Sequence, residues 1–324
     1  MSQQILIEAK GLKMHFPVGK SFFGKNQRLL KAVDGVDLSI QKGATYGLVG
    51  ESGCGKTTVG RCLVRLYDPT GGQVLYDGAD ITHLGYKELI PYRRQIQMIF
   101  QDPYASLDPR MTVEAIVMEP LRVRSDMPTK DKLDRVHQLV ELVGLKKDHL
   151  LRYPHEFSGG QRQRIGIARA LANEPRFVVC DEPISALDVS IQAQIINTLE
   201  ELQQKLGLTY LFVSHDLSMV RHISHRVGVM YLGTLVEEAT VEDLYSNMLH
   251  PYTRALLSAV PVPDPDAARN SVRIHLQGDV PTPIDPPSGC PFRTRCPEAL
   301  PACAEARPVL KDVGGGHCVA CHRV

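Results

Sequence analysis

The residues best suited to chemistry form one octet, Gly50-Glu51-Ser52-Gly53-Cys54-Gly55-Lys56-Thr57, which fills every fixed position of the phosphate-binding pattern G-x-x-x-x-G-K-[ST]. Three glycines let the backbone wrap closely around an anion, and a helix starting after them supplies unpaired N–H donors. Lys56 would hold the β- and γ-phosphates of a nucleotide, and Thr57 would ligate Mg²⁺. The octet predicts nucleotide binding; an ordinary glycine-rich turn is the alternative.

A second set of reactive side chains follows an apolar run. Phe177-Val178-Val179-Cys180-Asp181 predicts a central parallel strand that ends in acid, and Glu182 comes next. Asp181 can hold Mg²⁺ through water, and Glu182 can orient and polarise the water that attacks a nucleotide. An acidic pair at a strand end is, in isolation, more often a solvated turn, but the octet favours the hydrolytic interpretation.

Strands and helices alternate around these residues. Further strands are expected at 6–16, 30–40, 44–49, 71–78, 95–101 and 208–214, with a polar loop over 17–28. Two helices are marked by apolar residues at helical spacing, the first by Val59, Cys62, Leu63 and Leu66, the second by Ile191, Ile195, Leu199, Leu202 and Leu206. The alternation predicts an α/β fold with a mostly parallel sheet covered by helices.

The middle of the chain differs in character. Helical periodicity recurs over 113–122, 132–143 and 159–172, which predicts a helical subdomain inserted at about 105–172, and Ser158 is placed to cap its last helix. Eleven of the 22 prolines lie between Pro261 and Pro308. We therefore expect one domain over 1–260 and a Pro/Cys-rich extension over 261–324.

Composition narrows the class of protein. The 37 Lys and Arg residues are balanced by 36 Asp and Glu, so the basic excess expected of a nucleic-acid-binding protein is absent. The sequence beginning at Met1 has no basic region followed by an apolar core, and it contains no run of 18 apolar residues. The expectation is a cytosolic protein that does not bind nucleic acid.

A longer set of motifs makes the sequence resemble the ATP-binding cassette (ABC) family. The family signature Leu-Ser-Gly-Gly-Gln appears as Phe157-Ser158-Gly159-Gly160-Gln161, and the octet, Gln101, Asp188 and His215 fall at matching positions over roughly residues 5–260. The resemblance implies a P-loop NTPase fold of ABC type. Such a fold has a parallel RecA-like sheet core, an N-terminal antiparallel β subdomain and an inserted α-helical subdomain, here followed by a small irregular Cys/Pro-rich domain.

The resemblance also implies a role for each matched residue. Nucleotide contacts would come from Phe16, which would stack on adenine, and from Gly50, Ser52, Gly53, Cys54, Gly55, Lys56, Thr57 and Thr58. Mg²⁺ would be held by Thr57, Gln101 and Asp181, and catalysis would involve Glu182, His215 and Gln101. The signature residues would act in trans, by contacting the γ-phosphate of the nucleotide bound to a second subunit; they are Ser158, Gly159, Gly160 and Gln161. Asp188 would communicate across the dimer.

The segments 101–109, 250–257 and 290–297 resemble the ATPases of oligopeptide and dipeptide importers. Such subunits work in pairs beneath two membrane permeases, and we expect the partner here to be a homologous subunit that forms a heterodimer with this chain. An extracytoplasmic solute-binding protein delivers the cargo to the permeases. The resemblance places the chain at the cytoplasmic face of the membrane, with peptides as the main cargo. Nickel, glutathione and oligosaccharide importers are similar, and a soluble ABC protein acting on ribosomes or DNA is the alternative from another class.

Five of the eight cysteines lie in the last 35 residues, which suggests a metal site more than disulfides in a reducing compartment. Their spacing fits neither a paired C-x₂-C zinc ribbon nor a ferredoxin pattern. Four sulfur ligands suit a [4Fe–4S] cluster, and the resemblance points to Cys290, Cys296, Cys303 and Cys321, with Cys318 as the alternative to Cys321. Zinc bound by cysteines, or with His317 or His322, is the second interpretation, and free buried thiols are the third.

Overall fold

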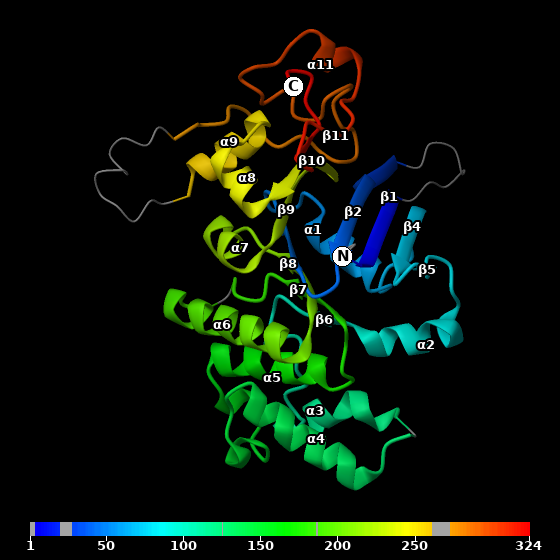
Figure 1. Cartoon of the computed structure of the whole chain (residues 1–324), viewed down its shortest axis with the longest axis vertical. Helices are drawn as coiled ribbons and strands as arrows, with labels where there is room; N and C mark the ends of the chain where they lie inside the picture. The colour runs from blue at the N-terminus through cyan, green and yellow to red at the C-terminus, as the bar shows by residue number, and fades with distance from the viewer. Residues whose placement is uncertain (1–3, 20–27, 125, 186, 261–272) are drawn as a thin grey trace. The chain divides into compact units, whose positions relative to one another are not determined.

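The computed structural model of the 324-residue chain describes residues 4–19, 28–124, 126–185, 187–260 and 273–324 (Figure 1). The chain divides into two compact units. The first consists mainly of Leu84–Val213, with Gln41–Ala44. The second consists of Ile5–Ile40, Thr45–His83 and Ser214–Val324. The boundary expected at residue 260 adjoins a segment, 261–272, that lies outside the described residues.

The first unit contains three parallel strands, β6 (Ile96–Ile99), β7 (Phe177–Asp181) and β8 (Thr209–Val213). Their register places Ile96 opposite Phe177, and Phe177 opposite Thr209. Every residue of β7 and β8 is buried, as expected for parallel strands that are covered on both faces. The expected parallel strands at both apolar runs are confirmed.

The crossover helix between these strands is α6 (Val189–Leu206). It buries Ile195, Ile196, Leu199 and Leu202, but Leu206 is 41% exposed. The predicted apolar face is therefore wrong at its last position, because the helix ends there at Gly207, which adopts a left-handed conformation with φ 65°.

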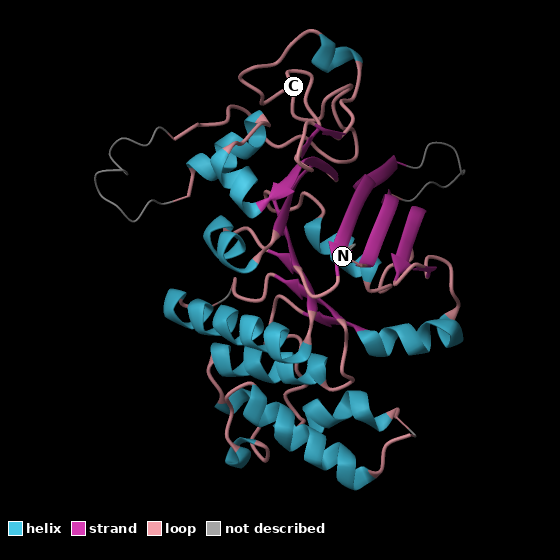
Figure 2. Ribbon diagram, viewed as in Figure 1, coloured by secondary structure: helices cyan, strands magenta, loops and turns pink. Residues whose placement is uncertain are grey.

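Three further helices of the first unit lie where the helical insert is predicted, and they lie together in Figure 2. They are α3 (Val113–Arg122), α4 (Thr129–Leu142) and α5 (Gly159–Leu171), with short 3-10 turns η1 (Lys147–His149) and η2 (Pro154–Glu156) between the last two. Thr112 caps α3 by accepting a hydrogen bond from the Ala115 N–H at 3.3 Å. One helix, α2 (Tyr86–Gln95), is not predicted by the sequence; it buries only Leu89, so its apolar periodicity is weak.

The second unit contains an antiparallel sheet in the order β2 (Arg28–Gln41), β1 (Ile5–Val18), β4 (Gly71–Tyr76), β5 (Ala79–Asp80). The turn between β4 and β5 places Asp77 and Gly78 at φ 50° and 80°, which is the conformation of a tight hairpin. This sheet corresponds to the N-terminal β subdomain expected of the family.

The same unit holds β3 (Thr45–Val49), which runs parallel to β9 (Arg226–Tyr231). Antiparallel strands continue from β9 in the order β10 (Thr234–Thr240), β12 (Cys318–Val319), β11 (Lys311–Asp312). The helices of this unit are α1 (Lys56–Leu63), α7 (Leu217–Ile223), α8 (Val241–Ser246), α9 (Pro251–Ser258) and α11 (Ala302–Glu305). The C-terminal residues therefore extend the sheet that carries β3.

Helix α1 is shorter than predicted. It ends at Leu63, and Leu66 is 54% exposed instead of buried. Arg65 adopts a left-handed conformation, φ 53°, which turns the chain out of the helix. In the part of the chain that the structure describes, no helix combines the length and apolar character needed to cross a membrane.

Candidate functional site

The phosphate-binding octet joins the buried strand β3 to helix α1, as the sequence predicts. Two of its glycines are required by close contacts. A Cβ atom on Gly50 would lie 2.3 Å from the Met230 carbonyl oxygen, and one on Gly55 would lie 2.1 Å from the Ala32 carbonyl oxygen. Both residues also have positive φ, 150° and 107°. The loop conformation thus excludes side chains at both positions.

Lys56 is folded back against its own loop. Its Nζ atom donates hydrogen bonds to the carbonyl oxygens of Gly50, at 2.8 Å, and Glu51, at 3.0 Å, and the residue is only 4% exposed. Helix α1 begins after the left-handed Gly55 without a side-chain cap. The ammonium group and the first N–H groups of α1 together form an anion site suited to phosphates.

The other residues of the octet differ in exposure. Ser52 and Gly53 are exposed, and Thr57 and Thr58 are half-buried. Cys54 is buried, and burial raises the pKa of its thiol. The predicted contacts of these residues with a nucleotide remain predictions.

Phe16, the predicted adenine contact, lies near the end of β1 and is half-buried. Its ring meets Tyr67 edge to face, with centroids 5.5 Å apart. The neighbouring His15 places Nε2 3.0 Å from Oδ1 of Asp34. A partly exposed aromatic ring held by a neighbour is able to stack on a base.

The acidic residues of the first unit occupy the end of β7 as predicted. Asp181 is buried and only 1% exposed, whereas Glu182 is half-buried. The side chain of Gln101, which follows β6, donates a hydrogen bond from Nε2 to Oε2 of Glu182 at 2.8 Å. The structure thus brings together two residues, 81 positions apart, that were predicted to serve one reaction.

The backbone of Glu182 is itself unusual. It has φ 43°, a left-handed conformation that costs a non-glycine residue about 1–2 kcal/mol. Its N–H donates to the Val213 carbonyl oxygen at 2.9 Å, and its carbonyl accepts a hydrogen bond from the Ser185 hydroxyl at 3.1 Å. These two bonds hold the strained residue in place.

The signature residues form the start of α5. The Ser158 hydroxyl accepts a hydrogen bond from the Gln161 N–H at 3.4 Å, and Gln161 Oε1 accepts one from the Ser158 N–H at 3.1 Å. This reciprocal capping box leaves Ser158 exposed, while Phe157 is buried beneath it. A Cβ atom on Gly160 would lie 2.4 Å from Cγ2 of Ile191 on α6, so close helix packing requires glycine there.

Asp188 and His215 each precede a helix, and both are exposed. Asp188 occupies the N-cap position of α6 without capping it through its side chain. His215 lies between β8 and α7, and the following Asp216 caps α7 by accepting hydrogen bonds from the N–H groups of Ser218 and Met219. Their predicted roles between subunits remain predictions.

Two contacts to the phosphate loop are not predicted by the sequence. The Glu51 N–H donates to the Tyr252 hydroxyl at 2.9 Å, and the Glu51 carboxylate forms an ion pair with Arg295. Arg295 lies in the Pro/Cys-rich extension, 244 residues from its partner. No spacing or pattern in a single sequence links positions so far apart.

The C-terminal cysteines approach one another without forming a complete metal site. Burial raises the pKa of Cys290 to about 11, and the nearby thiols of Cys303, Cys321 and Cys296 add to this shift. Cys318 instead lies on β12 opposite Glu238. Across the described ranges, no group of three or more His, Cys, Asp or Glu is arranged to hold a metal ion. The predicted four-cysteine set is thus gathered, but not into ligand geometry.

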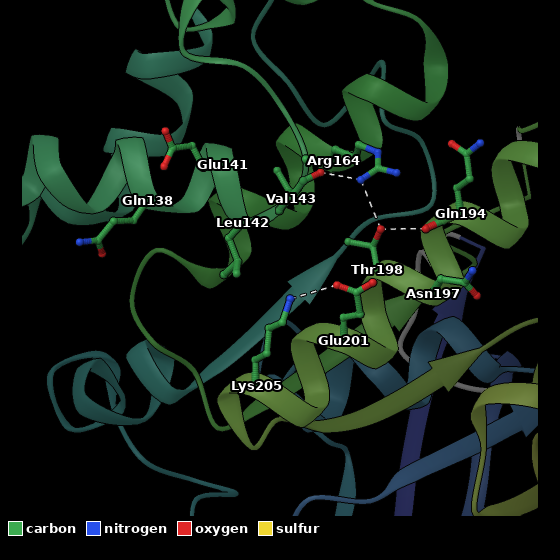
Figure 3. Close-up of a pocket in the computed structure, with 11 residues that line it drawn as sticks. Gln138, Glu141, Leu142, Val143, Arg164, Gln194, Asn197, Thr198, Glu201 and Lys205 are labelled. Atoms are coloured by element: carbon green, nitrogen blue, oxygen red, sulfur yellow. Dashed lines mark hydrogen bonds and ion pairs between the residues drawn. The ribbon is translucent and has the colours of Figure 1, made fainter.

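A cavity of about 710 Å³ in the first unit lies among α4, α5 and α6 (Figure 3). Arg164 donates a hydrogen bond to Thr198 Oγ1 there at 3.2 Å, and Lys205 pairs with Glu201 at 3.0 Å. None of the predicted site residues lines this cavity. We therefore do not assign the nucleotide to it.

Comparison with known proteins matches this arrangement to transporter ATPases. The family model described as ABC transporter matches residues 33–185, and the one described as oligopeptide/dipeptide transporter, C-terminal region, matches residues 236–303. The chain is 57% identical over 318 residues to the putative oligopeptide transport ATP-binding protein YkfD of Bacillus subtilis, covering 98% of this chain and 95% of YkfD. It is 53% identical to the oligopeptide transport ATP-binding protein OppF of Salmonella typhimurium, covering 99% and 97%.

The fold also matches solved structures. One is the dimeric structure of the ATP-binding cassette MJ0796 in a post-hydrolysis state bound to ADP and Pi, with a TM-score of 0.65 and 28% identity. The match covers 73% of this chain and 99% of that one. A second match, at the same TM-score and 24% identity, is cbiO1 from Clostridium perfringens, which supports the fold alone.

Proposed function

The chain belongs to the ATP-binding cassette family of transporter ATP-binding proteins and hydrolyses ATP, and we propose that this hydrolysis powers the import of short peptides. The proposal that the cargo is a peptide rests on the match of residues 236–303 to the oligopeptide/dipeptide transporter C-terminal region. Near-complete coverage of relatives named for oligopeptide transport supports the same conclusion.

The phosphate loop would bind the triphosphate of ATP. Lys56 Nζ, now held by two carbonyl oxygens, would turn to the β- and γ-phosphates, and the N–H groups at the start of α1 would hold the remaining oxygens. Thr57, Gln101 and Asp181 would hold Mg²⁺, which neutralises charge on the phosphates when bound.

Glu182 would polarise the attacking water. Its carboxylate is already fixed by the 2.8 Å hydrogen bond from Gln101, and its strained backbone is held by two further bonds. A carboxylate fixed in this way is oriented before the water arrives, which is what general base catalysis requires. His215 would contact the γ-phosphate from the loop before α7.

The exposed position of Ser158 supports a shared site. Ser158 is exposed at the N-terminus of α5, and a helix N-terminus is suited to bind an anion such as the phosphate of a nucleotide held by another chain. We propose that Ser158, Gly159, Gly160 and Gln161 serve the γ-phosphate of a homologous partner subunit, with Asp188 at the same interface. Two permeases at the cytoplasmic face of the membrane and an extracytoplasmic solute-binding protein would complete the transporter.

Purification of the assembled complex from membranes tests this function. Its ATPase activity in liposomes should rise when the solute-binding protein is supplied with dipeptides or oligopeptides, relative to the unloaded binding protein. Stimulation by nickel, glutathione or an oligosaccharide but by no peptide would refute the peptide cargo and identify the related importer instead. A chain that purifies with ribosomes or DNA and without permeases would contradict the transport function.

We also propose that the C-terminal cysteines hold a [4Fe–4S] cluster. Support comes from the donor set, four thiols brought near one another by folding, and from the hydrogen bond between the Cys290 N–H and the Cys303 carbonyl oxygen at 2.8 Å. Of the two candidates for the fourth ligand, Cys321 adds to the burial that raises the pKa of Cys290, whereas the pKa of Cys318 is influenced by burial, Glu238, Asp312 and Arg226 and not by the other thiols. The thiols would need to draw closer on binding, which couples metal binding to local folding.

Anaerobic purification with analysis of iron, zinc and sulfide tests the cluster. Equal iron and sulfide, lost in Cys303→Ser and retained in Cys318→Ser, is the expected result. One zinc without sulfide would assign the site to zinc, and no metal at all would leave free thiols.

A further inference from the structure

Glu51 of the phosphate loop is paired with Arg295 of the Pro/Cys-rich extension in a two-pronged ion pair. Arg295 Nη1 lies 2.7 Å from Oε2 of Glu51, and Nη2 lies 3.0 Å from Oε1. The arginine side chain is only 8% exposed, and the glutamate side chain 27%. This is the bidentate geometry in which guanidinium–carboxylate pairs are strongest, and it is shielded from solvent on the arginine side.

The backbone of Arg295 is bonded to a residue of a buried aromatic cluster. Its N–H donates to the carbonyl oxygen of Phe292 at 3.0 Å, and Phe292 is 1% exposed. The Phe292 ring packs against Tyr231 and Tyr252, with centroids 5.2 Å and 5.3 Å away. Since both tyrosines are fully buried, Arg295 cannot shift without disturbing this aromatic cluster.

Glu51 has all of its polar groups engaged. Its carboxylate is held by Arg295, its N–H by the Tyr252 hydroxyl at 2.9 Å, and its carbonyl oxygen accepts a hydrogen bond from Lys56 Nζ at 3.0 Å. Glu51 thus links the C-terminal region directly to the lysine that would bind phosphate. Because Tyr252 of α9 and Arg295 of the extension each hold a different polar group of Glu51, these two segments fix where the first turn of the loop lies.

We propose that Arg295 is a positioning residue for ATP binding, which acts by fixing the phosphate loop through Glu51 without touching the nucleotide. The inference rests on ATP as the ligand of this loop. A loop held in its binding conformation before the nucleotide arrives loses less entropy on binding than a mobile one. The Pro/Cys-rich extension is then part of the nucleotide site, and its folding state sets the affinity for ATP.

Such a role makes a specific kinetic prediction. The phosphates contact the loop both in the bound ground state and in the transition state, so loosening the loop weakens binding of both. The affinity for ATP should therefore fall, while turnover at saturating ATP should change little. A loss of stability that is merely structural would instead lower the amount of active protein without this split.

Titration of the full-length chain with MgATP by calorimetry measures the affinity. Arg295→Gln should weaken binding roughly tenfold or more, because small misplacements of binding groups cost one to two orders of magnitude. Arg254→Gln is the matched control. Arg254 pairs with Glu298 at 2.9 Å in the same region but does not contact the loop, so its loss should leave the affinity unchanged. Arg295→Lys should restore only part of the affinity, since lysine cannot form the two-pronged pair.

The partner residue provides an independent variant. Glu51→Gln should weaken binding in the same way, and the double variant Glu51→Gln with Arg295→Gln should bind no more weakly than the weaker single variant. If Arg295→Gln does not fold, the partly exposed Glu51→Gln decides the question. Wild-type affinity in folded Glu51→Gln or Arg295→Gln, or equal weakening in Arg254→Gln, would overturn the proposal. Failure of the wild-type chain to bind MgATP would instead overturn the ATP assignment on which the proposal rests.

Discussion

Gln101 donates a 2.8 Å hydrogen bond from Nε2 to Oε2 of Glu182, so the glutamine that follows β6 holds the carboxylate that follows β7. The parallel pairing of these two strands, with Ile99 opposite Cys180, brings their ends to one edge of the sheet. The bond orients the Glu182 carboxylate, which is the group that would accept a proton from water.

Replacement of this carboxylate separates binding from chemistry. We expect Glu182→Gln to bind MgATP with wild-type affinity but to hydrolyse it at least about 10²-fold more slowly, since the amide keeps the shape but is no base. The same change should prolong the ATP-bound dimer. Phosphate release by the assembled complex is the measurement, and wild-type turnover there would show that Glu182 is not the base.

Removal of the glutamine should have a smaller effect. Gln101→Ala leaves the Glu182 carboxylate chemically intact but less well oriented, so turnover should fall roughly tenfold, in line with the loss of one hydrogen bond to a charged group. If Gln101 acts by orienting Glu182 and not through its proposed contact to Mg²⁺, the two losses should not add in the double variant with Glu182→Gln. Additive losses in phosphate release would indicate that Gln101 acts elsewhere.

The exposed position of Ser158 allows a test of the shared site. Ser158→Arg places a long cation where a γ-phosphate would approach from a partner, so hydrolysis at the shared site to which this chain contributes Ser158 should be abolished. Binding of MgATP to the isolated chain, measured by calorimetry, should be unchanged. Loss of that binding would mean that Ser158 serves the nucleotide of its own chain.

Two glycines of α5 should respond oppositely to alanine. A Cβ atom at Gly160 would lie 2.4 Å from the branched Ile191 side chain, so Gly160→Ala should destabilise the chain by about 1–3 kcal/mol. Gly166 in the same helix has open space around it, and Gly166→Ala should stabilise by about 0.5–1 kcal/mol through helix propensity. Urea unfolding of each variant checks the pair, and equal effects would refute the packing argument.

His250 should make stability depend on pH. Burial, aided by the nearby Arg254, lowers its pKa to about 4 from 6.5. The unfolded chain therefore binds a proton between pH 6.5 and 4 that the folded chain does not, so its contribution to stability is present above pH 6.5 and is lost as pH falls toward 4. This amounts to about 2 kcal/mol between pH 7.5 and pH 5.

The variant His250→Asn tests this dependence. His250 Nδ1 accepts the Tyr252 N–H at 3.1 Å as the cap of α9, and asparagine is also a good cap. The free energy of unfolding of the variant should fall by about 2 kcal/mol less than that of the wild type between pH 7.5 and pH 5. Equal slopes would contradict the low pKa.

The sequence by itself was sufficient wherever local chemistry determines structure. The octet between β3 and α1, the acid at the end of β7 and the N-cap at Ser158 were predicted because sterics, periodicity and hydrogen bonds within a few residues fix them. The bounds of α3 agree with its apolar periodicity for the same reason.

Only the tertiary structure decided which distant segments meet. The pairing of β12 with β10 and the ion pair between Glu51 and Arg295 both join residues that no short-range pattern connects. The physical reason is that such contacts depend on how whole elements pack: many partners are chemically suitable for one carboxylate, and the fold selects one of them.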